Sequence, residues 1–187
     1  MENTVSFRFY KTNMITILLL WTLSISCSMA QSKPMGYCEN PKFDKEVAKY
    51  ISQTVPVISV EQLRSFKDQG SPLVILDTRE PREYAISHIP GAINVGYDEF
   101  DMKNVPDIPK DAKVVVYCSI GYRSEKIGER LQSNGISHVN NLYGSIFEWA
   151  NKGYPLEDAT GKSTQKIHTY NKAWSKWVDE NQSEKVW

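Results

Sequence analysis

The segment of this 187-residue chain best suited to chemistry runs from Cys118 to Ser124 and reads Cys-Ser-Ile-Gly-Tyr-Arg-Ser. It directly follows an apolar run, residues 113–117, that has the composition of a strand buried on both faces. A loop leading into a helix directs backbone N–H groups inward and Arg123 adds positive charge, so both favour an anion such as a thiolate. Because the thiolate is the reactive form of cysteine, the segment predicts that Cys118 is a nucleophile for covalent group transfer.

The rest of this loop is predicted to bind the substrate: Ser119, Ile120, Gly121, Tyr122, Arg123 and Ser124. Gly121 can adopt the backbone angles that an amide cradle requires, and Ser124 is the expected cap of the following helix. Arg123 is expected to contact an anion, and the alternative is that its side chain points inward and braces the loop. A buried structural cysteine is the alternative for Cys118, but it does not explain a glycine and an arginine so close by.

Three further polar residues are predicted to support the site. Asp77 ends a second apolar run and lies two residues before Arg79, and ligands of parallel α/β sheets bind at the carboxyl ends of strands. We expect Asp77 to orient backbone or to pair with an arginine rather than to transfer a proton in catalysis. We expect Arg79 to be a structural ion-pair partner rather than a substrate ligand. His88 begins the sequence His-Ile-Pro-Gly, and its imidazole is a candidate general base.

The elements that must position these residues alternate along the chain. Strands are expected at 57–59, 73–77, 93–95, 113–117 and 139–142, and helices from 40 to about 53 and at 60–68, 78–87, 124–133 and 144–151. Ser59 and Gln62 form the expected capping box of the helix at 60–68. Alternating strands and helices with short connections predict an α/β fold with a doubly wound parallel sheet flanked by helices.

Residues 156–187 are a C-terminal, aromatic-rich extension that we expect to be helical. Tyr170, Trp174 and Trp177 follow one another at i, i+4 and i+7 and would share one face of a helix. One interpretation is a helix docked on the domain core. The alternative is a partner surface or a cap over the mouth of the active site.

Residues 1–30 have the pattern of a secretory signal peptide. Arg8 and Lys11 precede an apolar run at 14–25, and Ser28-Met29-Ala30 fits a cleavage site. One alternative is a bacterial lipoprotein signal ending before Cys27, which would place a lipid on that residue, and another is an uncleaved anchor. The domain plan is therefore a signal at 1–30, a helical lead-in at 31–55, a core domain at 56–155 and the extension at 156–187. We expect export to the bacterial periplasm or cell envelope, with membrane attachment only if Cys27 is lipidated.

Charge and composition exclude several functional classes. The chain has 22 Lys and Arg against 22 Asp and Glu, so its formal net charge of zero predicts no nucleic-acid partner. There is no Cys-x-x-Cys motif, and the three histidines have no metal-ligand neighbours at i+3 or i+4, so neither a metal nor a cofactor is expected. Cys38 and Cys118 remain after signal cleavage. Three alternatives stay open for Cys38: a disulfide or redox switch with Cys118, a resolving thiol, or an incidental free thiol.

The motifs together resemble the rhodanese-like domain family. Tyr84-Ala-Ile-Ser-His88-Ile-Pro-Gly-Ala fits the family's aromatic-x3-His-aliphatic-Pro-Gly-Ala signature, and Cys118-Ser-Ile-Gly-Tyr-Arg-Ser is similar to its active-site loop. Asp77-Thr-Arg79 is similar to the family's Asp-x-Arg step, and residues 142–149 resemble its closing signature. That last segment departs from the stricter pattern at Leu142, Tyr143 and Ile146, none of which carries chemistry.

The resemblance implies a single-domain sulfurtransferase that moves sulfane sulfur through a Cys118 persulfide. It also implies a structural turn at His88 rather than a role as general base. Cys118 to Arg123 spans six residues, as in the sulfurtransferases, whereas the related phosphatases have a loop one residue longer. Ser119 and Ile120 stand where thiosulfate-specialised members often carry cations, so thiosulfate, a persulfide and a protein sulfur donor or acceptor all stay open. The alternatives are a non-catalytic binding or redox-sensing module and, less favoured, a phosphatase-like activity.

Overall fold

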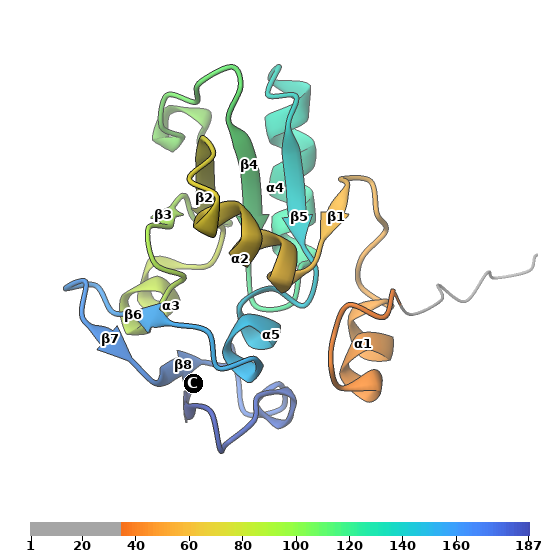
Figure 1. Cartoon of the computed structure of the whole chain (residues 1–187), viewed down its shortest axis with the longest axis vertical. Helices are drawn as coiled ribbons and strands as arrows, with labels where there is room; N and C mark the ends of the chain where they lie inside the picture. The colour runs from red at the N-terminus through yellow and green to blue at the C-terminus, as the bar shows by residue number, and fades with distance from the viewer. Residues whose placement is uncertain (1–34) are drawn as a thin grey trace, which may run out of the picture. The chain divides into compact units, whose positions relative to one another are not determined.

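The computed structural model describes residues 35–187, and the predicted signal at 1–30, with Cys27, lies outside the described residues. Five strands form one parallel sheet in the order β1-β5-β4-β2-β3 (Figure 1). They are β1 (Val57–Ile58), β2 (Leu73–Asp77), β3 (Ile93–Asn94), β4 (Lys113–Tyr117) and β5 (Val139–Leu142). The longest strands, β2 and β4, are neighbours in the middle of the sheet.

Helices accompany this sheet, as the alternating pattern predicts. They are α1 (Pro41–Val47), α2 (Val60–Asp68), α3 (Pro81–Ile86), α4 (Tyr122–Ser133) and α5 (Ser145–Asn151), with a short 3-10 turn at Met102–Asn104. The capping box expected at the start of α2 is present: Gln62 N–H donates to Ser59 Oγ, and Ser59 N–H donates to Gln62 Oε1. The prediction of a parallel sheet flanked by helices is confirmed.

Both faces of the central strands are buried, because successive strand residues point to opposite faces. One face packs with side chains of α1, α2 and α5, and its central residues are Ile75, Val115 and Tyr117. The opposite face packs with α4, and its central residues are Leu76, Val114 and Val116. The apolar runs before Asp77 and Cys118 are therefore a consequence of burial on two sides.

The N-terminal lead-in is less helical than expected. The helix predicted to run to about Gln53 ends at Val47, and Gln53 has a positive φ of 59°. The cause is tertiary: the buried carboxylate of Glu125 on α4 accepts the backbone N–H groups of Ser52 (2.8 Å) and Thr54 (3.0 Å). Those donors therefore bond to α4 rather than to carbonyls of their own helix.

The expectation of a C-terminal helix is wrong. The extension contains β6 (Leu156–Glu157), β7 (Ser163–Thr164), β8 (Lys166–His168) and β9 (Glu184–Val186), and its one helical turn is 3-10, at Ser175–Trp177. β8 pairs in parallel with β9, and Tyr170 has a left-handed φ of 65°, which interrupts a helix. The Asn171 side chain also accepts the N–H groups of Ala173 and Trp174, a local bond that competes with helical hydrogen bonding.

The extension nevertheless lies against the domain. β8 contacts α3, and in Figure 1 it lies beyond the carboxyl ends of the sheet strands. Trp177 packs on Phe43 of α1, with ring centroids 5.6 Å apart. Trp174 meets Tyr50 edge-on at 5.4 Å. Trp174 and Trp177 thus contact the N-terminal lead-in, whereas Tyr170 lies against Arg123, and the three residues do not form one helical stripe.

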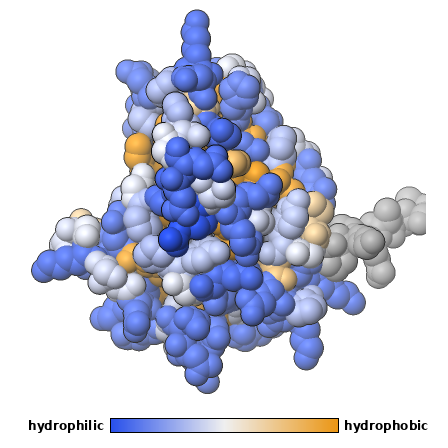
Figure 2. Space-filling view, viewed as in Figure 1, coloured by the Kyte–Doolittle hydropathy of each residue, from blue (hydrophilic) through white to orange (hydrophobic). Residues whose placement is uncertain are grey.

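One face of the described chain is mostly polar. Figure 2 shows a largely hydrophilic face with small, scattered apolar patches. Between residues 35 and 187, no helix combines the length and apolarity needed to cross a membrane.

Candidate active site

Cys118 is the first residue after β4, and its backbone is held by the start of α5. Its N–H donates to Ser145 Oγ (3.2 Å), and its carbonyl accepts the N–H of Ile146 (3.3 Å). The next carbonyl, that of Ser119, accepts the N–H of Phe147 (3.2 Å). These bonds seat the loop on α5, so the position of the cysteine depends on an element 27 residues further along the chain.

The thiol of Cys118 lies in an environment that favours its anion. The Gly121 N–H points at Sγ at 3.2 Å. Burial by itself raises the pKa of this thiol, but the charge of Arg123 and the N–H groups of Ser124, Gly121 and Ile120 outweigh it, so the pKa is lowered. The structure thus forms the amide cradle that the sequence predicts around the sulfur.

The turn of this cradle requires glycine. Gly121 has a φ of 122°, and a Cβ at this position would lie 2.6 Å from Cδ1 of Ile51. Gly121, and not Ser124, is the N-cap of α4, which begins at Tyr122. The expected capping role of Ser124 is therefore wrong: its hydroxyl donates to Asn141 Oδ1 (2.7 Å), and the Asn141 amide donates to the Gly121 carbonyl (2.9 Å).

Arg123 braces the loop, which is the alternative left open by the sequence. Its guanidinium makes a two-point ion pair with the carboxylate of Glu83 on α3, at 2.7 and 2.9 Å. It also donates to Ser119 Oγ (3.1 Å) and lies 5.3 Å from the ring centre of Tyr170. Burial raises the pKa of Glu83, but the hydrogen bonds and positive charge of Arg123 outweigh it and lower that pKa. Burial lowers the pKa of Arg123, but the hydrogen bonds to Glu83 and the nearby negative charges outweigh it and raise that pKa, so both groups stay charged.

Asp77 and Arg79 form a second ion pair, entirely inside the protein. Both side chains have no exposed surface, and the shortest contact joins Arg79 Nη2 to Asp77 Oδ2 at 2.6 Å. The same Nη2 donates to the Ser87 carbonyl (2.6 Å), and the Arg79 N–H donates to Asp77 Oδ1 (2.9 Å). The pair joins the end of β2 to the end of α3, and neither residue lines the cavity that contains Cys118.

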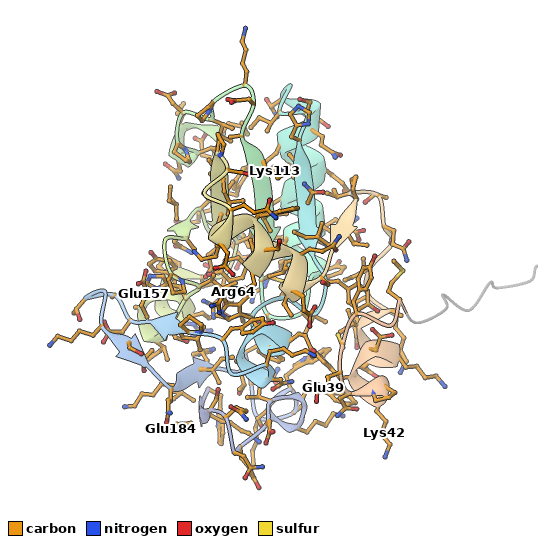
Figure 3. All side chains as sticks on the ribbon, viewed as in Figure 1. Glu39, Lys42, Arg64, Lys113, Glu157 and Glu184 are labelled. Carbon is orange, nitrogen blue, oxygen red and sulfur yellow. The ribbon has the colours of Figure 1, made fainter. Side chains whose placement is uncertain are left out.

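His88 lies in a turn attached to the extension. Its ring stacks on Tyr84 with centroids 3.7 Å apart, and Nδ1 lies 3.0 Å from the Tyr84 carbonyl. Its backbone exchanges hydrogen bonds with Glu157 of β6, whose carboxylate lies 3.3 Å from Nε2; Figure 3 labels Glu157. His88 is 4% exposed and is absent from the cavity lining, so the structure places it in the scaffold.

A cavity of about 550 Å³ contains Cys118 in its wall. Four of the predicted substrate-binding residues line it as well: Ser119, Ile120, Tyr122 and Arg123. Gly121 and Ser124 do not line it but direct their N–H groups at the sulfur. The rest of the wall comes from α3, from the segment after β3, from Tyr50 and from the extension. The arrangement places a thiol of lowered pKa in the wall of a substrate-sized space.

The second cysteine is not part of this cavity. Cys38 is buried, and its thiol pKa is raised by burial and by the carboxylates of Glu148 and Asp44. Cys38 and Cys118 are both free thiols. A raised pKa makes Cys38 a poor nucleophile, which favours the incidental thiol among the three alternatives. Between residues 35 and 187, no group of three His, Cys, Asp or Glu residues could hold a metal ion.

Three residues important to the site were not identified from the sequence. Glu83 pairs with Arg123, Ser145 holds the backbone of Cys118, and Asn141 ties Ser124 to Gly121. All three are buried polar residues on elements distant in sequence from the loop. For Glu83 the available signal was its position inside the expected helix at 78–87. An acid that becomes buried there requires a cationic partner, and Arg123 is that partner.

Comparisons with known proteins agree with this geometry. Residues 59–152 match the rhodanese-like domain family. A sulfurtransferase of Allochromatium vinosum is 36% identical over 99 residues, which are 53% of this chain and 92% of that protein. The thiosulfate sulfurtransferase GlpE of Pseudomonas fluorescens is 34% identical over 105 residues, 56% of this chain and 92% of that protein. The solved rhodanese-like domain of an Anabaena protein has a TM-score of 0.50 and 26% identity, covering 55% of this chain and 79% of that one.

Other relatives are larger than the matched region. The chain spans 54% of a Bacillus subtilis relative that is 29% identical and 25% of a Mycobacterium tuberculosis relative that is 32% identical. The lead-in before residue 59 and the extension after residue 152 lie outside the family match.

Proposed function

This chain belongs to the rhodanese-like domain family, and on that premise we propose that it is a sulfurtransferase in which Cys118 carries sulfane sulfur as a persulfide. The observation that carries the proposal is the lowered pKa of Cys118 inside a cradle of backbone N–H groups. A thiolate at this position can attack sulfur, and the same amides can hold the persulfide anion that results. The sulfurtransferase relatives support sulfur as the transferred group.

The first half-reaction loads the cysteine. The Cys118 thiolate attacks the outer sulfur of the donor, an S–S bond forms, and the donor's own S–S bond breaks. With thiosulfate the leaving group is sulfite, and with an organic persulfide it is a thiolate that retains the electron pair. The proposal includes a small-molecule donor and a protein donor, because the reacting atoms are the same.

The second half-reaction unloads the cysteine. A thiophilic acceptor attacks the outer sulfur of the persulfide, and Cys118 departs as the thiolate that the cradle stabilises. No net redox change or cofactor is required, and two successive half-reactions predict ping-pong kinetics. Arg123 keeps the cradle in shape through Glu83 and supplies positive charge near the departing sulfur.

Persulfide formation can be tested directly by mass. The protein is incubated with thiosulfate, a polysulfide or an organic persulfide, and the intact mass is compared with that of Cys118→Ser. We expect the mass of one sulfur atom to be added, at Cys118 only, and to be lost when cyanide or a thiol is supplied. Absence of loading by every donor, together with partner binding that Cys118→Ser retains, would support a binding module instead. Hydrolysis of a phosphate ester that requires Cys118 would support the phosphatase-like alternative.

We also propose that the protein works outside the cytoplasm, from the signal pattern at residues 1–30. Cell fractionation with N-terminal analysis of the recovered protein tests this. A mature chain beginning near Gln31 supports secretion, a lipid on Cys27 supports the lipoprotein, and an intact N-terminus in the cytoplasm contradicts export.

A further inference from the structure

The cavity at Cys118 is larger than inorganic sulfur donors require. Its volume is about 550 Å³, within the range of roughly 300–1,000 Å³ typical of pockets for organic ligands. Thiosulfate has only five non-hydrogen atoms and would leave most of this space to water. The unused space indicates a substrate with a body beyond its reacting sulfur atoms.

The wall of the cavity is aromatic. Five aromatic side chains line it: Tyr50, Tyr97, Tyr122, Tyr170 and Trp174. Aromatic rings provide a large apolar surface at low conformational cost, and Tyr and Trp add a polar edge. Tyr50, Tyr170 and Trp174 lie outside the family match at 59–152, so this part of the wall comes from the chain's own flanking segments.

The charges at the cavity disfavour a dianion. Three acidic residues line it, Glu80, Glu83 and Asp98, against two basic ones, Arg82 and Arg123. Arg123 is already paired with Glu83, so the remaining charged residues of the lining are one base, Arg82, and two acids, Glu80 and Asp98. Thiosulfate would bring two further negative charges, whereas a neutral or ammonium-bearing compound would not add to this excess.

The aromatic residues of the extension are held in place rather than loosely attached. The Tyr170 N–H donates to His168 Nδ1 (3.1 Å), and the residue between them, Thr169, is buried and donates its N–H to the Val186 carbonyl (2.7 Å). The Tyr170 ring lies over Arg123, and Trp174 packs edge-on against Tyr50. The extension therefore reaches the catalytic loop itself through a defined contact.

We propose that Tyr170 and Trp174, with Tyr50, form a binding wall for the organic body of the sulfur substrate. The substrate class is an organic thiol or persulfide with a neutral or ammonium-bearing body, in preference to thiosulfate. In loading, the Cys118 thiolate attacks the outer sulfur of R–S–SH, giving Cys118–S–SH and the thiolate R–S⁻. In unloading, R–S⁻ attacks the outer sulfur of the Cys118 persulfide and becomes R–S–SH. This inference rests on the proposed sulfurtransferase function.

The test measures transfer from loaded full-length protein to three thiols. Benzyl mercaptan has a neutral aromatic body, 4-(mercaptomethyl)benzoate has the same body with a carboxylate, and mercaptoethanol has almost no body. We expect kcat/KM for benzyl mercaptan to exceed the values for the other two by roughly tenfold, a factor typical of burying one aromatic group. Tyr170→Ala and Trp174→Ala should each lower the benzyl-to-mercaptoethanol ratio about fivefold, mainly through KM. Because this ratio is compared between each variant and the wild type, the difference in intrinsic reactivity between the two thiols cancels.

Trp187→Ala is the matched control. Trp187 is an aromatic residue of the same extension, 58% exposed and absent from the cavity lining, so its loss should leave the ratio unchanged. If Trp174→Ala fails to fold, Tyr170→Ala decides, because Tyr170 is half-exposed. An unchanged ratio in folded Tyr170→Ala, or equal kcat/KM for all three thiols in the wild type, would overturn the inference. Normal loading of Cys118 in the same protein would still support the sulfurtransferase function. Failure of every donor to load Cys118 would instead remove the proposed function, and this inference with it.

Discussion

Arg123 and Glu83 form an ion pair whose effects on stability and on the thiol can be separated by substitution. The Glu83 side chain is 1% exposed and that of Arg123 is 13% exposed, so the pair is nearly desolvated. Arg123→Met removes the charge but retains most of the packing of the side-chain stem. It leaves the Glu83 carboxylate buried without its cation.

The expected loss of stability follows from that burial. Removing one partner of a buried ion pair costs about 3–5 kcal/mol, whereas replacing both partners by uncharged groups is often close to neutral. Because Arg123 retains some exposure, we expect the lower end, about 3 kcal/mol, for Arg123→Met. The double variant Glu83→Gln/Arg123→Met should recover about 2 kcal/mol of this, since no unpaired charge remains.

The thiol should respond differently. The charge of Arg123 is the largest of the influences that lower the pKa of Cys118, and it is absent in both variants. The Cys118 pKa should therefore rise in the single and the double variant alike. The thiolate fraction at neutral pH falls about tenfold for each unit by which the pKa rises.

Urea unfolding and the pH dependence of iodoacetamide alkylation measure the two effects separately. Lys126→Met is the control, because Lys126 lies on the same helix and pairs with Glu129 at the surface, with 37% and 34% of the side chains exposed. It should change stability by less than about 0.5 kcal/mol and leave the alkylation profile unaltered. A double variant as unstable as Arg123→Met, or an unchanged thiol pKa in Arg123→Met, would refute the reasoning.

Three further predictions concern the scaffold of the site. Gly121→Ala should destabilise the protein by about 1–3 kcal/mol and slow alkylation of Cys118, because the positive φ and the 2.6 Å approach to Ile51 both oppose a Cβ; wild-type stability and reactivity would contradict this. Asp77→Asn should cost about 3–5 kcal/mol in urea unfolding because it leaves Arg79 buried without a full negative charge, and a loss below about 1 kcal/mol would contradict it. The lowered pKa of Glu83 adds stability that is complete above its unfolded value of 4.5 and is lost as pH falls through the lower folded value. Unfolding curves below pH 4.5 should thus decline more steeply in the wild type than in Glu83→Gln/Arg123→Met, and identical slopes would count against the assignment.

The segments on both sides of the family match contribute side chains to the cavity wall. Tyr50 precedes the family match, whereas Tyr170 and Trp174 follow it, yet all three line the cavity at Cys118. The loop from Cys118 to Ser124 and the strands β2 to β5 lie within the family match. The selectivity proposed here comes from segments added at both ends.

Local signals in the sequence determined the sheet and the position of Cys118 after β4. The capping box of Ser59 and Gln62 fixed the start of α2, because its hydrogen bonds lie within four consecutive residues. Cys118 directly follows the apolar run of β4, and Gly121 and Arg123 come within the same short loop. In each case the interacting groups are close in the chain, so their types and spacing contain the information.

Only the tertiary structure decided the partners of these groups. Glu125 takes two backbone donors from the lead-in and thereby ends the predicted helix early, and Glu83 pairs with Arg123, which braces the loop. Tyr170 adopts a left-handed backbone, and β8 pairs with β9, where the aromatic spacing predicted a helix. These outcomes depend on burial and charge pairing between segments far apart in the chain. The sequence thus singled out Cys118 as the candidate nucleophile, and the fold determined how its anion is stabilised and what lies around it.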